Sequence, residues 1–152
     1  MIFIGQGDAG DIASIMPVMN DAFDPAFGEA WTSSQCLSLL AIPGSKLILA
    51  RKDNTCIGFA LTRWVLDEEE LLMIGVAPAF QRDTVGSQIL DIVINGARIA
   101  NRSKLFLEVR DGNNAQYFYR ASGFLDTGRR KNYYKGTDGH LFDAITMVYL
   151  LS

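Results

Sequence analysis

One segment of the sequence joins an apolar stretch to a short polar turn, a combination that can bind an anion. The apolar stretch ends at Ile74-Gly75-Val76, a turn follows, and residues with helical spacing begin near Val85. Backbone N–H groups at a helix start lack intrahelical partners, and the helix dipole favours negative charge there. Arg82 would add charge-assisted donors. The segment favours a pyrophosphate cradle, although an ordinary strand, turn and helix with a surface arginine would have the same residues.

A lone carboxylate within an apolar strand is the second candidate for chemistry. Glu108 lies in residues 104–110, where Leu105, Leu107 and Val109 alternate with other side chains as they do in a strand. In a narrow, half-buried site a carboxylate has a raised pKa and can take a proton from an ammonium group, directly or through water. The alternative is a carboxylate near a strand end that faces water.

A glycine pattern near the start of the chain suggests a dinucleotide site but lacks the context for one. Residues 5–10 read Gly-Gln-Gly-Asp-Ala-Gly, which matches G-x-G-x-x-G between a strand and a helix. No parallel strand ending in an acidic residue follows at the required spacing, because a second helix and Pro43-Gly44 intervene. We therefore expect a glycine-rich turn before a capped helix.

The other reactive side chains are few. His140 is the single histidine and lies beside a predicted hairpin turn, so we expect an exposed loop residue and neither a histidine metal site nor a Ser-His-Asp triad. Residues 67–70 are acidic and predict a solvated turn, which could also attract a cationic peptide. Cys36 and Cys56 are expected to be small buried hydrophobic residues, since two cysteines cannot form a disulfide framework.

Composition limits the class of protein. The chain has 152 residues, 49% of them apolar and 20% charged, which predicts one globular domain over residues 1–152. A net charge of −3 argues against general nucleic-acid binding, which needs a basic face. The first residues do not resemble a secretory signal, and no apolar run approaches the ~20 residues of a spanning helix. We expect a cytoplasmic protein without a membrane partner.

The hydrophobic spacing predicts four helices and seven strands. The first predicted helix is capped by Asp8 or Asp11 and runs to about Phe23, and the others occupy residues 32–42, 85–100 and 115–121. The predicted strands occupy residues 2–4, 46–51, 56–66, 71–76, 104–110, 124–135 and 142–150. Pro17 should kink or split the first helix. The order β-α-α-β-β-β-α-β-α-β-β predicts a mixed α/β domain with helices on both faces of the sheet, and it disfavours a doubly wound fold because it does not alternate strictly.

Several of these segments together resemble one enzyme superfamily. Residues 74–90 are similar to motif A of the GNAT N-acetyltransferases, Q/R-x-x-G-x-G/A after an apolar strand, with Gln81, Val85 and Gly86 in place and Thr84 where the first glycine is expected. Residues 105–110 and 118–124 resemble the strand and helix end that follow. Residues 129–134, 137–139 and 143–147 and the loop 27–32 are similar to the ribosomal-protein-alanine N-acetyltransferases, the RimI subfamily. The resemblance covers nearly the whole chain.

The resemblance implies a single-domain GNAT fold whose central sheet is splayed and mostly antiparallel, with acetyl-CoA in the gap beside motif A and no metal. The pantetheine arm would pair like an extra strand with Ile74, Gly75 and Val76, and the N–H of Val76 would polarise the thioester carbonyl. The other implied cofactor-binding residues are Gln81, Arg82, Asp83, Thr84, Val85, Gly86, Ser87 and Asn113. We expect Thr84 to have a negative φ, because a β-branched residue at positive φ is strained.

The resemblance also implies roles in catalysis. Glu108 would be the general base and Tyr119 the general acid that protonates the departing thiolate of coenzyme A. An acceptor peptide would contact Trp31, Asn132, Tyr133 and Tyr134. The implied reaction is direct attack by the N-terminal alanine of a small-subunit ribosomal protein, and an α-amino group, with a reference pKa of ~7.7–8.0 against ~10.4 for lysine, is the easier amine to deprotonate. The alternative is a degenerate CoA-binding or interaction module, which Asp83, Thr84 and the loop at Asn113, one residue shorter than in the family, would favour.

Overall fold

The computed structural model describes residues 1–151, which form one seven-stranded sheet in the order β1-β2-β3-β4-β5-β7-β6. The strands are β1 (Ile2–Gly7), β2 (Ser45–Lys52), β3 (Thr55–Val65), β4 (Glu68–Val76), β5 (Lys104–Arg110), β6 (Leu125–Lys135) and β7 (Leu141–Leu150). The helices are α1 (Ile12–Ala22), α2 (Ser33–Leu40), α3 (Val85–Ile99) and α4 (Ala115–Ala121), with short 3₁₀ turns at Ala9–Asp11, Pro25–Phe27 and Pro78–Phe80.

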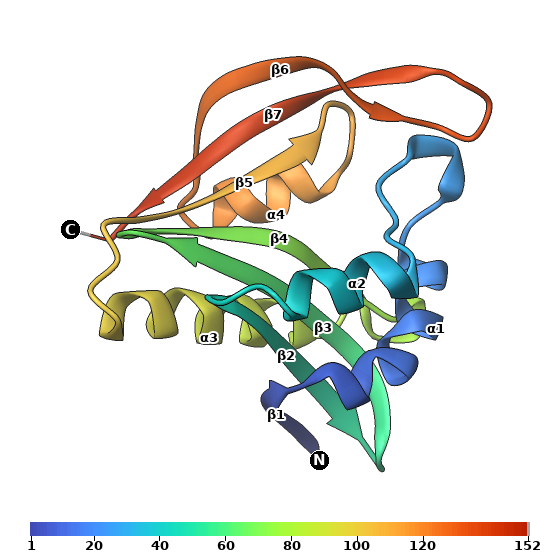
Figure 1. The fold of residues 1–152 in the computed structure, drawn as a ribbon, viewed down its shortest axis with the longest axis vertical. Coiled ribbons are helices and arrows are strands. Elements are labelled where there is room, and N and C mark those ends of the chain that lie inside the picture. Colours follow the sequence, from blue (N-terminus) through green and yellow to red (C-terminus); the bar gives the residue numbers. More distant parts are fainter. Residues whose placement is uncertain (152) are drawn as a thin grey trace.

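The sheet is antiparallel except where β4 meets β5. That parallel pairing consists of three residue pairs and ends at Glu70 and Phe106, after which the strands separate. Figure 1 shows β4 and β5 meeting near the C-terminus and diverging toward the opposite side of the molecule. The predicted splayed, mostly antiparallel sheet is therefore confirmed. The gap between β4 and β5 opens directly after the pair Glu70 and Phe106.

Helices cover both faces of the sheet, as the sequence predicts. On one face α3 places Val85, Ile89 and Val93 in a core shared with β4, β5 and β7. On the other face α1 and α2 pack Ile15, Met19 and other side chains against β2 and β3 (Figure 1). Each helix has one apolar stripe, so each face of the sheet is closed by burying such a stripe.

A β-bulge bends β4 where the gap opens. Leu61 pairs with Met73 and Thr62 pairs with Leu71, so Leu72 is an extra residue. Leu71 packs in the core on the α3 side, whereas Met73 packs in the core on the α1 and α2 side. A bulge of this kind reverses the alternation of side chains and re-aims the strand. It therefore turns the end of β4 away from β5.

The loop before α2 lies directly against the end of the β6–β7 hairpin (Figure 1). Gly28 has φ +71°, and a Cβ there would overlap the backbone of Lys135. A Cβ on Gly136 would overlap the carbonyl of Ala26 in the same way. Glycine is required at both positions because the two backbones touch. Their contact joins the N-terminal third of the chain to its last hairpin.

The observed order of elements matches the prediction, but one local prediction is wrong and a second is wrong in part. The acidic stretch 67–70 is not a solvated turn: the turn is Leu66-Asp67, and β4 already begins at Glu68. Pairing with β3 and β5 extends the strand, so Glu69 is buried. Pro17 does not split α1, which runs from Ile12 to Ala22. A proline removes one helical N–H, and here the packing of the apolar face outweighs that loss.

The remaining sequence predictions have mixed outcomes. The glycine-rich turn is confirmed only in its last part: Gly5 and Gly7 belong to β1, which pairs antiparallel with β2 rather than entering a βαβ unit, and the turn begins at Asp8, which forms a capping box with Asp11. His140 is exposed, and its ring Nδ1 lies 2.6 Å from the carboxylate of the nearby Asp138. Cys36 is buried as expected, but Cys56 is only partly buried. No helix among residues 1–151 is long and apolar enough to cross a membrane.

Candidate active site

A cleft of about 540 Å³ lies where β4 and β5 separate. The end of β4 forms one wall with Ile74, Gly75 and Val76. The start of α3 contributes a second set of lining residues, Asp83, Gly86 and Ser87. The opposite wall belongs to α4 and the turn before it, with Asn113, Phe118 and Tyr119. The splayed sheet therefore produces the cleft, and it brings the motif A segment to face α4.

The edge of β4 in this cleft has no strand partner. Beyond Glu70 the strand pairs only with β3, so its other edge faces the cleft. The N–H of Ala77 donates to the carbonyl of Ile57 on β3 at 2.8 Å. Because N–H groups alternate sides along a strand, the N–H of Val76 points away from β3 and toward the cleft. The cleft therefore offers backbone hydrogen-bond groups to an extended, amide-containing ligand.

The turn between β4 and α3 is stabilised by its own side chains. The Gln81 side-chain amide donates to the carbonyl of Val76 at 3.0 Å. Thr84 has φ −84°, the negative value that the sequence predicts, and its hydroxyl accepts a hydrogen bond from the Gln88 side chain at 2.7 Å. The threonine therefore fits the turn without strain, although it stands where the motif has glycine. Val85 is fully buried in the core, so only its backbone can face a ligand.

A smaller pocket of about 120 Å³ adjoins the cleft. Its aromatic lining residues are Phe23, Trp31, Tyr119, Tyr133 and Tyr134. Three carboxylates also line it, those of Glu29, Glu70 and Glu108. Tyr119, Glu29, Ile74 and Asn113 are shared with the cleft. We name this space the acceptor pocket, and it meets the cleft at Tyr119.

The Glu108 carboxylate is held deep in the acceptor pocket. Its side chain is only 4% exposed. Thr146, its direct partner on β7, donates a hydroxyl hydrogen bond to Oε2 at 2.6 Å. Arg130 Nε lies 2.9 Å from Oε1, an ion-pair contact without hydrogen-bond geometry. Within residues 1–151, Oε1 thus accepts no hydrogen bond and is free to accept one from a bound amine.

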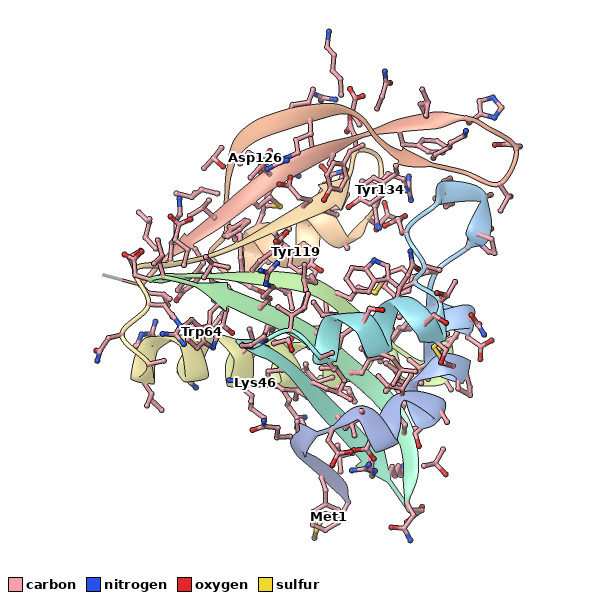
Figure 2. The ribbon with its side chains drawn as sticks, in the orientation of Figure 1. Met1, Lys46, Trp64, Tyr119, Asp126 and Tyr134 are labelled. Atoms are coloured by element: carbon pink, nitrogen blue, oxygen red, sulfur yellow. The ribbon has the colours of Figure 1, made fainter. Side chains whose placement is uncertain are left out.

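Tyr119, labelled near the middle of the molecule in Figure 2, lines both the cleft and the acceptor pocket. Its ring packs against Phe118 and Phe124, with ring centroids 5.4 and 5.7 Å away. Burial, and secondarily the negative charge of Glu29, raise the pKa of Tyr119 well above its ordinary value. No residue in 1–151 forms a hydrogen bond with its hydroxyl. The side chain therefore presents a protonated O–H group where the cleft joins the acceptor pocket.

An irregular stretch of β6 brings two tyrosines into the acceptor pocket. Arg130 pairs with Ala144 and Tyr134 with Phe142, so β6 has two residues more than β7 over this stretch. Asn132, with φ +53°, forms the bend, and its backbone N–H donates to Asp143. Tyr134 donates a hydrogen bond to the Glu108 carbonyl at 3.1 Å, and burial raises the pKa of Tyr134. Asn132 therefore shapes the pocket wall without lining the pocket.

Glu29 ties the N-terminal loop to the start of α4. Its carboxylate accepts hydrogen bonds from Arg110 Nε at 2.7 Å and from the Asn113 side chain at 2.9 Å. Asn113 in turn accepts a hydrogen bond from the Ala115 N–H at 2.9 Å. The Arg110 guanidinium lies 3.8 Å from the centroid of the Phe27 ring. Asn113, expected from the resemblance to hold the cofactor arm, is thus already engaged by Glu29 and by the backbone of the first residue of α4.

The structure gathers most of the predicted site residues, although not all of them. The cleft or the acceptor pocket is lined by Trp31, Ile74, Gly75, Val76, Gln81, Asp83, Gly86, Ser87, Glu108, Asn113, Tyr119, Tyr133 and Tyr134. Arg82, Thr84, Val85 and Asn132 do not line either space. Sequence reasoning missed Glu29, Glu70, Arg130 and Thr146. Thr146 and Arg130 reach Glu108 only through the register of β5, β7 and β6, which no local sequence signal specifies.

Comparison with known proteins supplies independent information. Residues 23–138 match the family described as acetyltransferase (GNAT) domain. A [ribosomal protein bS18]-alanine N-acetyltransferase from Haemophilus ducreyi is 34% identical over 122 residues, covering 80% of this chain and 83% of the relative. Among solved structures, the ribosomal-protein-S18-alanine N-acetyltransferase of Escherichia coli has a TM-score of 0.88 at 30% identity, over 100% of this chain and 95% of that one. A putative acetyltransferase from Salmonella typhimurium, solved with acetyl-CoA, shares the fold with a TM-score of 0.80 at 18% identity, over 100% and 95%.

Proposed function

The chain belongs to the GNAT acetyltransferase family and is an acetyl-CoA-dependent N-acetyltransferase, and we propose that its acceptor is the N-terminal alanine of a small-subunit ribosomal protein. The relative from Haemophilus ducreyi and the Escherichia coli structure carry names that specify this acceptor. One observation carries the proposal for this chain. The cleft beside motif A meets a small acidic and aromatic pocket at Tyr119, with Glu108 on the pocket side.

The cleft fits acetyl-CoA, which supplies an acetyl thioester when bound. The open edge of β4 at Ile74, Gly75 and Val76 suits the amide groups of a pantetheine arm. The first turn of α3 suits a pyrophosphate, because its N–H groups lack intrahelical partners. Asp83 lies on the same rim and opposes an anion there. The part of the motif that lines the cleft is therefore Gln81, Asp83, Gly86 and Ser87, with one unfavourable charge among them.

We assign the proton-accepting step to Glu108. Oε2 is fixed by Thr146, and Oε1 is buried without a hydrogen bond among residues 1–151. An ammonium group in the acceptor pocket can transfer one proton to Oε1, which leaves a neutral amine and a carboxylic acid. The neutral amine attacks the thioester carbonyl directly: the N–C bond forms, the C–S bond breaks, and the second proton that the nitrogen loses is taken up by the departing CoA thiolate. No acetyl group is carried by the protein in this scheme.

Val76 and Tyr119 are assigned to the negative charge that develops on the thioester oxygen and on the departing sulfur. The Val76 N–H can donate to the thioester oxygen, which becomes more negative during attack. The Tyr119 hydroxyl can donate a hydrogen bond to the departing sulfur. A thiol has an ordinary pKa near ~8.5, so a tyrosine whose pKa is raised above its ordinary value keeps its proton, and Tyr119 stabilises the thiolate by a hydrogen bond instead of protonating it as the general acid that the resemblance implies. Tyr119 thus stays protonated at neutral pH and is ready for each turnover.

The acceptor pocket favours a small N-terminal residue. Its volume of about 120 Å³ leaves room for a short side chain beside the amine, while Trp31 and Tyr133 provide apolar walls with polar tips. An α-ammonium also loses its proton more readily than a lysine side chain, by reference pKa values of ~7.7–8.0 against ~10.4. Both features favour acetylation at an N-terminal alanine over acetylation of a lysine.

A turnover assay tests the proposal. The purified protein is incubated with acetyl-CoA and a peptide that begins with alanine, and release of free CoA is followed. The matched control is the same peptide with its α-amino group already acetylated. We expect release only with the free amine, together with a rise in melting temperature with acetyl-CoA but not with NAD. Stabilisation by acetyl-CoA with no turnover on any peptide would favour a binding module instead.

A further inference from the structure

Glu70 lies where the acceptor pocket begins. It forms the last pair of the β4–β5 ladder, opposite Phe106, before the two strands separate. Paired residues of neighbouring strands face the same side of a sheet, and Phe106 and Glu108 share a face because they are two residues apart. The Glu70 side chain is therefore one step along the same face from Glu108. Both carboxylates line the acceptor pocket.

The two carboxylates are not equally provided with partners. Glu108 has Thr146 and Arg130 at 2.6 and 2.9 Å. Among residues 1–151, no hydrogen bond or ion pair within 4 Å reaches the carboxylate of Glu70. Two guanidinium groups lie near the pair, those of Arg130 and Arg63, but neither comes within 4 Å of the Glu70 carboxylate. Glu70 therefore keeps a carboxylate that an ammonium group in the pocket can contact.

The charged and titratable groups that face Glu70 come from three strands. Arg63 is its cross-strand partner on β3, Glu108 lies on β5, and Arg130 and Tyr133 lie on β6. Burial raises the pKa of Glu70, the charge of Glu108 raises it further, and Arg130 and Arg63 oppose both effects. A half-buried carboxylate without a partner costs folding free energy, so a purely structural role would be better served by a neutral residue.

We propose that Glu70 is a specificity-determining residue that binds the acceptor's α-ammonium together with Glu108, and that it selects against N-termini whose first side chain is acidic. This inference rests on the proposed function. An ammonium group has three N–H donors, so it can contact both carboxylates at once. Glu108 accepts the proton, while Glu70 keeps the nitrogen in place and repels a carboxylate side chain. Both effects act on acceptor binding and not on acetyl-CoA.

Steady-state kinetics of Glu70→Gln test the proposal, with Glu68→Gln as the matched control. Glu68 lies on the same strand and face but contacts Lys104 at 3.5 Å outside the pocket. For a peptide beginning with alanine, we expect Glu70→Gln to raise the acceptor KM about tenfold, with kcat and the KM for acetyl-CoA unchanged. The preference for an alanine peptide over an aspartate peptide should fall about tenfold. Glu68→Gln should behave like the wild type.

Two further measurements distinguish a role of Glu70 in binding the acceptor from a role in stabilising the fold. Protonation removes the negative charge of Glu70, so in the wild type the acceptor KM should rise as pH falls through its raised pKa, and Glu70→Gln should lack this rise. A carboxyl group with a raised pKa contributes stability below its unfolded pKa and loses that contribution as pH rises through the folded value. Glu70→Gln should therefore be at least as stable as the wild type at pH 7.

Three outcomes would count against the inference, and each is distinguishable. An unchanged acceptor KM in Glu70→Gln, with an active wild type, would overturn the inference alone. A lower melting temperature together with a parallel rise in the KM for acetyl-CoA would assign Glu70 a structural role and would overturn it as well. A wild type that acetylates no peptide would overturn the proposed function and this inference together.

Discussion

The Thr146 hydroxyl donates a 2.6 Å hydrogen bond to the Glu108 carboxylate across the β5–β7 ladder, where the two residues are direct partners. The bond fixes Oε2, while Oε1 is buried beside Arg130 and accepts no hydrogen bond among residues 1–151. A carboxylate with one restrained oxygen and one available oxygen is suited to accept a proton from a group that enters from a single direction. The pairing of two strands thus orients the proposed base.

Replacement of Glu108 by glutamine should reduce kcat by about 10²–10⁴-fold, the usual loss when a general base is removed. The amide has nearly the same shape, so the fold should be retained. Acetyl-CoA binding should stay within a few-fold, because Glu108 lines the acceptor pocket and not the cofactor cleft. Steady-state rates and calorimetric titration measure the two quantities. Activity within a few-fold of the wild type would remove Glu108 from the mechanism.

Replacement of Tyr119 by phenylalanine should lower kcat by about tenfold or more without loss of stability. The hydroxyl has no hydrogen-bond partner among residues 1–151, while the ring keeps its packing against Phe118 and Phe124. Removing a buried hydroxyl without a partner leaves no orphaned group behind. Thermal unfolding and turnover are measured on the same preparation. An unchanged rate would mean that water alone serves the departing thiolate and that the tyrosine is structural.

Thr84→Gly should change the Kd for acetyl-CoA by less than about tenfold, or about 1.4 kcal/mol. Thr84 already has a negative φ, so glycine relieves no strain. The lost hydroxyl is a hydrogen-bond partner of Gln88 and does not line the cleft. Calorimetric titration of both proteins gives the comparison. Tight binding by the variant with no detectable heat for the wild type would contradict the enzyme assignment.

Asp83→Asn should tighten acetyl-CoA binding by about threefold to tenfold at low ionic strength. Asp83 lines the cleft at the start of α3, so its charge opposes the phosphates expected there. The gain should shrink in 1 M salt, where the screening length is about 3 Å. Asp91→Asn is the control, because Asp91 is exposed later on the same helix and lies outside the cleft. Equal gains in both variants would indicate a general charge effect.

The sequence was sufficient for the architecture because its signals were local. The apolar spacing of residues 85–99 and the alternation of residues 104–110 each define an element, and motif A locates the cleft. The site was less predictable because its partners are distant in sequence. Glu29 reaches Asn113 across 84 positions, and Thr146 reaches Glu108 across 38. The local composition of residues 67–70 predicts a turn, and this prediction is wrong for Glu70 because pairing with β3 and β5 extends β4 to Glu68.

The central claim is that the acceptor is an N-terminal α-amine, and the position of the acetyl group tests it most directly. A peptide that begins with alanine and contains one internal lysine is incubated with acetyl-CoA and the wild-type protein, and fragment mass spectrometry locates the added group. Our account predicts one acetyl group on the alanine nitrogen and none on the lysine. Acetylation of the lysine, or recovery of unmodified peptide while acetyl-CoA is consumed, would contradict it.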